Sequence, residues 1–238
     1  KETTPYETLG ENDFGGRKFT IVDANVDGIQ VNIPEDEMNG EVVNDALIVR
    51  DDAIKDRYNI NIEYVRDDNV AMVKNSVLAG DNEYNLVYSK IYQFAPLATE
   101  EILADLCSFR DIDLSSKWWS PLMAEKLTLN DHLYFTASDI APSIYQAPFC
   151  MFLNLELWED YNFDIDVYET VLEGKWTLDV LSGLTKDLDR DLNDDGKMSP
   201  KDDFFGVGMQ TSNEMSIAFM ESAGLVMTEL TPDKTNIT

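Results

Sequence analysis

In the first hundred residues, the spacing of apolar residues alternates between that typical of strands and that typical of helices. Compact or alternating apolar runs at residues 19–22, 60–64 and 84–88 are rich in β-branched and aromatic side chains, which predicts three short strands. Between these runs, apolar residues recur at helical spacing over residues 41–58 and 70–79, which predicts two helices. The order strand, helix, strand, helix, strand is typical of a parallel sheet. We therefore expect an α/β fold.

The helical periods also predict which side chains face the core. In the second helix, Val70, Val73 and Val77 point inward and Gly80 forms a left-handed cap. A further helix is expected at residues 96–105. The apolar face of the first helix consists of Val43, Ala46, Leu47, Ile54 and Tyr58.

The segment from Ser89 to Gln93 is predicted to be the loop after the third strand. Ligands of parallel sheets bind at the carboxyl ends of the strands, where such loops converge. This segment is therefore a candidate ligand-binding loop.

The remaining segments are less regular. Residues 1–15 are polar and contain turn residues, which predicts a flexible leader. Leu133 to Thr136 and Gln146 to Leu153 have the character of two strands in a hairpin-like piece. Residues 155–161 are predicted to be helical, and Thr177 is a suitable N-cap for the helix that follows it.

The charge excludes two classes of partner. The chain has 238 residues with 46 Asp and Glu against 18 Lys and Arg, a formal net charge of −28. Such a surface repels the phosphate backbone of nucleic acid and an anionic membrane surface. The start at Lys1, without an initiator Met or an apolar signal region, predicts that a targeting segment was removed or lies outside this sequence.

The two cysteines, Cys107 and Cys150, lie in apolar surroundings and outside any C-x-x-C pair. One interpretation is two small buried hydrophobic residues, and the alternative is a long-range disulfide. Either way, two cysteines are too few for a disulfide scaffold.

The strongest motif is DRDLNDDGKMSPKDD at residues 189–203. Counted from Asp191, it has the spacing of an EF-hand calcium loop, with Gly196 where the loop bends sharply. Asp replaces the usual Glu at the last ligand position, as in dockerin-like loops, which the segment resembles. The alternative is an acidic turn. The expected calcium ligands are Asp191, Asn193, Asp195, the carbonyl of Lys197 and Asp202.

We expect this calcium ion to have a structural role, in which it stabilises the folded loop. Sensor proteins work through paired loops that open a helix pair, and only one such loop is present. Binding to the folded state alone would stabilise the protein by linkage.

The sequence offers little support for an enzyme. His132 is the only histidine and lies in what reads as an exposed turn, so it is a poor candidate for a catalytic triad. A phosphate-binding loop and zinc-ligand spacing are also absent from the sequence. With 46 acidic residues, some pair of carboxylates is expected by chance, so no catalytic residue is predicted.

Two adjacent tryptophans, Trp118 and Trp119, lie in a turn-rich stretch. Neighbouring side chains on irregular backbone tend to point apart, so we expect at least one to face a cleft. An aromatic face is a suitable wall for a sugar ring or another neutral ligand. The alternative is that both belong to the core, as we expect for Trp158 and Trp176.

The chain resembles the extracellular solute-binding proteins of bacterial ABC importers, in the subgroup related to carbohydrate-binding family 1. The order and spacing of several stretches carry the likeness, and together they cover most of residues 16–225. These stretches are residues 16–21, 40–58, 85–106, 118–119, 174–178 and 191–209.

The resemblance implies a periplasmic-binding-protein-like fold of type II, in which two lobes with central sheets flanked by helices close over a ligand. Residues 16–148 would form lobe one, and residues 149–238 the crossing strand and the start of an incomplete lobe two. Asp139 would accept two hydroxyl hydrogen bonds from a sugar. The implied ligand-binding residues are Tyr88, Ser89, Lys90, Tyr92, Trp118, Trp119, Asp139 and Tyr145.

The resemblance also implies a function. The protein would capture a small neutral ligand, a carbohydrate, outside the cytoplasm and deliver it to the membrane subunits of an ABC importer. It would be exported and, in its full-length form, lipid-anchored at the cell surface. Family members are longer and complete their sheet later in the chain, so unfinished sheet edges would favour a dimer. The alternative is a secreted carbohydrate-active enzyme or surface module with a dockerin-like loop.

Overall fold

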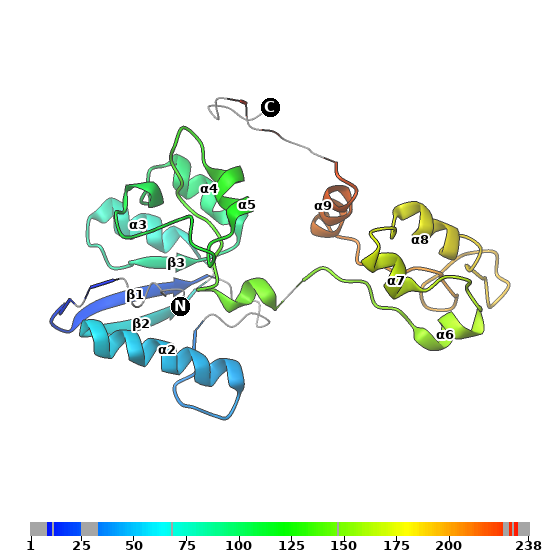
Figure 1. Ribbon diagram of the computed structural model, residues 1–238, viewed down its shortest axis with the longest axis horizontal. Coiled ribbons are helices and arrows are strands. Elements are labelled where there is room, and N and C mark those ends of the chain that lie inside the picture. The colour runs from blue at the N-terminus through cyan, green and yellow to red at the C-terminus, as the bar shows by residue number, and fades with distance from the viewer. Residues whose placement is uncertain are drawn as a thin grey trace. The chain divides into compact units, whose positions relative to one another are not determined.

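A computed structural model of the chain describes residues 9–10, 12–24, 33–67, 69–146, 148–225, 229 and 231–232 (Figure 1). The internal contacts divide the chain into two compact units. Unit 1 is Lys1–Pro148 together with Leu230–Thr238, and unit 2 is Phe149–Glu229. Most of the expected leader, residues 1–8 and 11, lies outside the described residues.

Unit 1 contains a three-stranded parallel sheet of order β2-β1-β3. Its strands are β1 (Arg17–Asp23), β2 (Ile60–Arg66) and β3 (Leu86–Tyr88). β1 is the central strand and pairs along its whole length with β2, whereas only its last three residues pair with β3. The three predicted strands and the α/β class are confirmed.

Helices flank this sheet on both sides (Figure 1). Helix α2 (Val42–Tyr58) lies along one side of the sheet, and α3 (Ala71–Ala79) and α4 (Ile91–Thr99) lie along the other. Unit 1 also contains helix α5 (Pro121–Leu127) and the 3-10 turns η1 (Leu106–Ser108) and η2 (Pro142–Tyr145). The main buried cluster joins β1 to α3, α4 and the chain after α4, through Val22, Ala24, Val73, Leu97 and Ile102.

Helix α3 largely follows its predicted pattern. Val73 is buried and Val70 packs against the same core, but Val77 is 43% exposed, so its inward assignment was wrong. Ser76 takes the buried position instead, because its hydroxyl bonds to the carboxylate of Asp81. The left-handed cap is confirmed: Gly80 has φ 74° and its N–H donates to the carbonyls at the end of the helix.

The inner face of α2 differs from the predicted one. Its buried residues are Asn44, Leu47 and Asp51, while Val43 is 45% exposed and Ala46 is exposed as well. Two polar side chains can be buried here because both are hydrogen-bonded to other parts of the unit. Asn44, for example, accepts from the Glu35 N–H at 2.7 Å, which fastens the preceding loop to the helix.

Helix α4 begins earlier than predicted. The sequence placed Pro96 near the start of a helix at residues 96–105, where proline is tolerated. The structure has α4 at Ile91–Thr99, with Pro96 inside it. Burial of Leu97, with partial burial of Phe94, outweighs the one backbone hydrogen bond that proline cannot make. The loop after β3 is therefore only Ser89 and Lys90, because α4 starts at the next residue.

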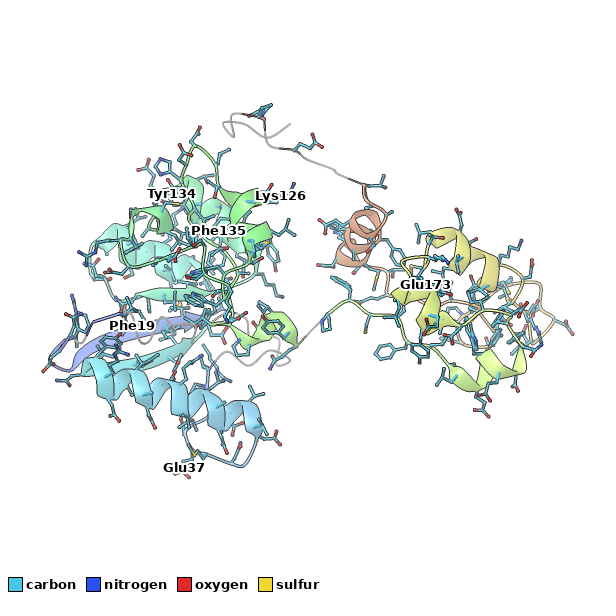
Figure 2. All side chains as sticks on the ribbon, in the orientation of Figure 1. Phe19, Glu37, Lys126, Tyr134, Phe135 and Glu173 are labelled. Atoms are coloured by element: carbon cyan, nitrogen blue, oxygen red, sulfur yellow. The ribbon has the colours of Figure 1, made fainter. Side chains whose placement is uncertain are left out.

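The predicted hairpin is absent from the described residues. Leu133 is fully buried, and Phe135, which Figure 2 labels, stacks on Phe94 with ring centroids 5.4 Å apart, but neither run forms a strand. Pro142 starts the turn η2 between the two runs. Backbone hydrogen bonds fasten Leu133 to the segment after α4, since the Leu106 N–H donates to its carbonyl at 2.7 Å and its own N–H donates to Asp105 Oδ1 at 3.1 Å.

Unit 2 consists of four described helices: α6 (Leu155–Asp160), α7 (Val167–Leu172), α8 (Leu178–Thr185) and α9 (Asn213–Ser222). The predicted helix at residues 155–161 and the Thr177 cap are confirmed, since the Thr177 hydroxyl accepts from the Val180 N–H. Phe149 to Leu153 forms neither helix nor strand, so the prediction of a crossing strand at these residues was wrong. Each helix has a side-chain N-cap, in chain order Asn154, Asp166, Thr177 and Ser212.

Candidate functional site

The carboxyl ends of the three parallel strands meet at one edge of the sheet in unit 1. The Ala24 N–H donates to the Tyr88 carbonyl at 2.9 Å, and the Asp67 N–H donates to the Asp23 carbonyl at 3.2 Å. Asp23 is 3% exposed and Tyr88 is 9% exposed. This edge, which is where ligands of parallel sheets bind, therefore contains a buried carboxylate and a buried phenol.

A buried ion pair lies beside this edge. The Asp51 carboxylate is 2% exposed, and its Oδ1 accepts from Arg50 Nε at 2.8 Å and Nη2 at 2.7 Å. Its Oδ2 accepts from the Tyr64 hydroxyl at 2.5 Å, and Arg50 Nη2 also donates to that hydroxyl oxygen. All three polar groups are thus partnered, which is the condition under which a buried carboxylate is tolerated.

Burial keeps the two tyrosines of this region protonated. Loss of hydration raises the pKa of Tyr88 to about 12, with Arg50 opposing the shift and the charges of Asp51 and Asp23 adding to it. Burial, together with the hydrogen bond to Asp51, also raises the pKa of Tyr64. At neutral pH both side chains are therefore neutral hydroxyl groups.

A second group joins two chain segments of unit 1. The Asp139 N–H donates to the Trp118 carbonyl at 2.9 Å, and Trp119 forms an isolated antiparallel bridge with Ser138. The Tyr145 hydroxyl donates to the Asp139 carboxylate. The structure therefore brings the main chain of Trp118 to Asp139 and Tyr145, so three of the predicted ligand-binding residues are neighbours.

Arg50 connects the two groups. Its Nη1 donates to the Ile140 carbonyl at 3.3 Å, next to Asp139, while its other nitrogens hold Asp51 and Tyr64. The segment that carries Asp139 is thus fastened to the helix beside the sheet edge. We call the residues Trp118, Asp139 and Tyr145, with the Arg50 contact that fixes them, the edge site.

The other predicted ligand residues of unit 1 lie at the junction of β3 and α4. Tyr88 is buried, whereas Tyr92 is 66% exposed in the first turn of α4. The Ser89 hydroxyl donates to the Gln93 side chain. Lys90 is the residue before the helix, half-buried like Ser89.

Sequence reasoning missed the buried polar residues. None of Asp23, Arg50, Asp51 and Tyr64 was predicted to be a site residue. One signal was available: Asp51 is four residues after Leu47, so it occupies an inward position of the helical period. A charged residue at such a position is buried only where partners compensate its charge, as Arg50 and Tyr64 do here.

The acidic loop of unit 2 is closed by its own side chains. Asp191 Oδ2 accepts from the Gly196 N–H at 2.8 Å, and Asn193 Oδ1 accepts from the Asp195 N–H at 3.0 Å. Asp195 Oδ1 accepts in turn from the Lys197 N–H at 2.8 Å. Glycine is required at position 196, where φ is 76°.

Asp203 and Asp202 have different places in this loop. The Asp203 carboxylate accepts from the Leu192 N–H at 2.9 Å and the Ser199 N–H at 2.7 Å, so it braces the loop across its width. Asp202, the predicted last ligand, is exposed. No group of three or more His, Cys, Asp or Glu side chains that would hold a metal gathers among the described residues.

One atom of the loop fits a cation. Asp191 Oδ1 is buried and has no hydrogen-bond partner, although the other oxygen of the same carboxylate is bonded. A buried acceptor without a partner costs free energy, and a hard cation such as calcium would satisfy it. Asp191 is also the first ligand position of the motif.

The single histidine and the two cysteines lie outside both sites. His132 is exposed, as expected, and its Nδ1 lies 2.8 Å from Asp105 Oδ2. Cys107 and Cys150 are both free and exposed, so the interpretation of two buried hydrophobic residues was wrong. Their apolar neighbours in the sequence do not cover them in the fold.

Comparisons of the chain with protein-family models, with curated proteins and with solved structures find no match. None of the described helices has the length and apolar character needed to cross a membrane. The geometry of the edge site and of the acidic loop therefore carries the functional argument.

Proposed function

We propose that this chain is an extracytoplasmic solute-binding protein of type II architecture, which captures a neutral carbohydrate for the membrane subunits of an ABC importer. One observation carries the proposal: the edge site groups Trp118, Asp139 and Tyr145 beside the carboxyl edge of a parallel sheet. An indole face can stack on a sugar ring, and a carboxylate can accept hydrogen bonds from two hydroxyl groups.

The electrostatics favour a neutral ligand over an anionic one. The net charge of −28 repels anions, and Asp139 adds a further negative charge within the site. A sugar hydroxyl loses little free energy when it exchanges a hydrogen bond with water for one with a carboxylate. Hydrogen bonds to charged groups are stronger than those between neutral groups. The proposal requires binding alone, with no catalytic step.

Replacing Asp139 tests the sugar site. We expect wild-type protein to change its tryptophan fluorescence with at least one sugar of a panel of mono- and oligosaccharides. Asp139→Asn should weaken that binding about ten- to hundredfold, because a hydrogen bond to a charged acceptor contributes about 1.5–3 kcal/mol. Glu125→Gln, which neutralises an exposed carboxylate on α5, is the matched control and should bind like wild type. Equal binding by wild type and Asp139→Asn would contradict the proposed site.

The same proposal includes one structural calcium ion in the acidic loop. Asp191, Asn193, Asp195 and the Lys197 carbonyl would hold it, with Asp202 completing the set. The unpartnered Asp191 Oδ1 supports this assignment. The ion would neutralise neighbouring carboxylates and fix the loop in its folded form.

Chelation tests the calcium assignment. We expect calcium at a hundred times its Kd to stabilise the protein by about 2.7 kcal/mol, which is roughly 5–10 °C in Tm for a chain of this size. Excess chelator should remove that gain. Asp191→Asn should have the same Tm in calcium and in chelator. Asp194→Asn is the control: residue 194 is not a ligand position of the motif, so calcium should raise its Tm as it does in wild type. A calcium response in Asp191→Asn equal to that of wild type would refute the site.

A dimer through sheet edges belongs to the same proposal. Within the described residues, β2 and β3 each have one unpaired side, since β1 lies between them. An unpaired edge presents free backbone donors and acceptors to a second copy of the chain.

A further inference from the structure

A shallow hollow of about 490 Å³ opens on unit 2, lined by residues of α6, the start of α7 and the chain between them. Its volume lies within the range of small-molecule sites. The hollow has an aliphatic part, three aromatic walls and two carboxylates. The lining side chains that matter here are Leu155, Trp158, Phe163, Tyr168, Asp164 and Asp166.

The aromatic walls are held by contacts with one another. The Trp158 and Phe163 rings lie 4.8 Å apart between centroids with an interplanar angle of 51°. Phe163 also stacks on Tyr161 at 5.8 Å. Tyr168, on α7, is 63% exposed and forms an outer wall. The rings are thus positioned before any ligand arrives, which lowers the cost of binding.

The two charged side chains that line the hollow, Asp164 and Asp166, are both negative. Asp166 uses Oδ1 to cap α7, accepting from the Tyr168 N–H at 2.9 Å and the Glu169 N–H at 3.0 Å. Asp164 is exposed and accepts no hydrogen bond from the described residues. None of the residues that line the hollow is Lys, Arg or His.

This combination selects among ligand classes. An anion would be repelled, and a neutral apolar molecule would leave the carboxylates unused. A sugar could use the same aromatic faces and carboxylates but gains nothing from the negative charge of the site, so it is the alternative that the test below includes. A cation with an apolar surface uses both features, because aromatic faces and carboxylates each attract positive charge.

We propose that unit 2 binds a small organic ammonium cation in this hollow, with its quaternary ammonium group against Trp158 and Phe163 and near Asp164. The cation–π attraction and the carboxylate act on the same charge, and the net charge of the chain raises the local concentration of cations. This site is separate from the edge site, which belongs to unit 1.

Calorimetric titration of the full chain with choline, in the presence of calcium, tests the proposal. We expect choline to bind, and its neutral isostere 3,3-dimethyl-1-butanol to bind at least about tenfold more weakly, since it lacks only the charge. Asp164→Asn should weaken choline binding about tenfold. Asp160→Asn, at an exposed carboxylate of α6 outside the lining, should change it less than about twofold and is the matched control.

Three outcomes would overturn the inference. If choline and its isostere bind with equal affinity, the charge contributes nothing and the hollow binds only apolar surface. No choline binding at about 10 mM, with circular dichroism showing a folded protein, would remove the site. Sugar binding that Asp164→Asn abolishes would assign the hollow to carbohydrate instead. Asp139→Asn should leave choline binding unchanged, so failure here is distinguishable from failure of the proposed sugar site.

Discussion

Replacing Asp51 by alanine should lower the free energy of unfolding of unit 1 by about 2–4 kcal/mol. Removing one partner of a fully buried ion pair costs about 3–5 kcal/mol, because the other charge stays buried without compensation. Asp51 is 2% exposed, but the Arg50 side chain keeps 27% exposure and so regains part of its hydration. Urea unfolding followed by circular dichroism measures the change.

Asp52→Ala is the matched control for this prediction. Asp52 is the next residue on the same helix, its side chain is 60% exposed, and it pairs with Lys55 at 3.3 Å. An exposed pair of this kind contributes about 0–1 kcal/mol. Similar losses in both variants would contradict the role of the buried pair. Tyr64→Phe should cost about 1.5–3 kcal/mol, because it removes hydrogen bonds to two charged groups, Asp51 and Arg50.

The buried pair also links stability to the proposed binding. Once Asp51 is absent, Arg50 loses the carboxylate that orients it, although its hydrogen bond to the Ile140 carbonyl remains possible. We therefore expect the segment carrying Asp139 to be less firmly held. Asp51→Ala should weaken sugar binding in addition to lowering stability, whereas Asp52→Ala should change neither.

Hydrophobic periodicity was sufficient to predict the order of strands and helices in the sheet region of unit 1. The strands around residues 19–22 and 60–64 recur as β1 and β2, and the Gly80 cap follows from local backbone geometry. These features depend on neighbours in the chain, so a single sequence contains the information. The same holds for the Thr177 cap in unit 2.

Features that depend on residues far apart in the sequence could not be predicted from hydrophobic periodicity or motif spacing. Apolar patterns assigned Val43 to the core of α2, but Asn44 and Asp51 are buried because residues outside the helix bond to them. Likewise, motif spacing identified the acidic loop, yet nothing in the spacing indicated that Asp203 would brace it through two backbone N–H groups. Partners far apart in sequence decide which polar groups are buried.

Gly206→Ala should destabilise unit 2 by about 1–3 kcal/mol, the usual cost of forcing extra volume into a packed site. A Cβ at residue 206 would lie 2.5 Å from the Thr185 carbonyl oxygen and 2.9 Å from Leu188 Cβ. Both contacts are too close, and the first is with backbone at the end of α8, which cannot move aside as a flexible side chain can. Thermal unfolding of the calcium-loaded protein measures the effect.

The neighbouring glycine provides the control, because a Cβ at Gly208 would meet nothing within 4 Å. Gly208→Ala should therefore leave the Tm nearly unchanged. The Gly206 N–H also donates to Asp189 Oδ1 at 2.8 Å, just before the acidic loop, so a shifted backbone would loosen that loop. We accordingly expect Gly206→Ala to weaken calcium binding as well, while Gly208→Ala does not. Equal stability and calcium affinity in the two variants would show that the contact with α8 is unimportant.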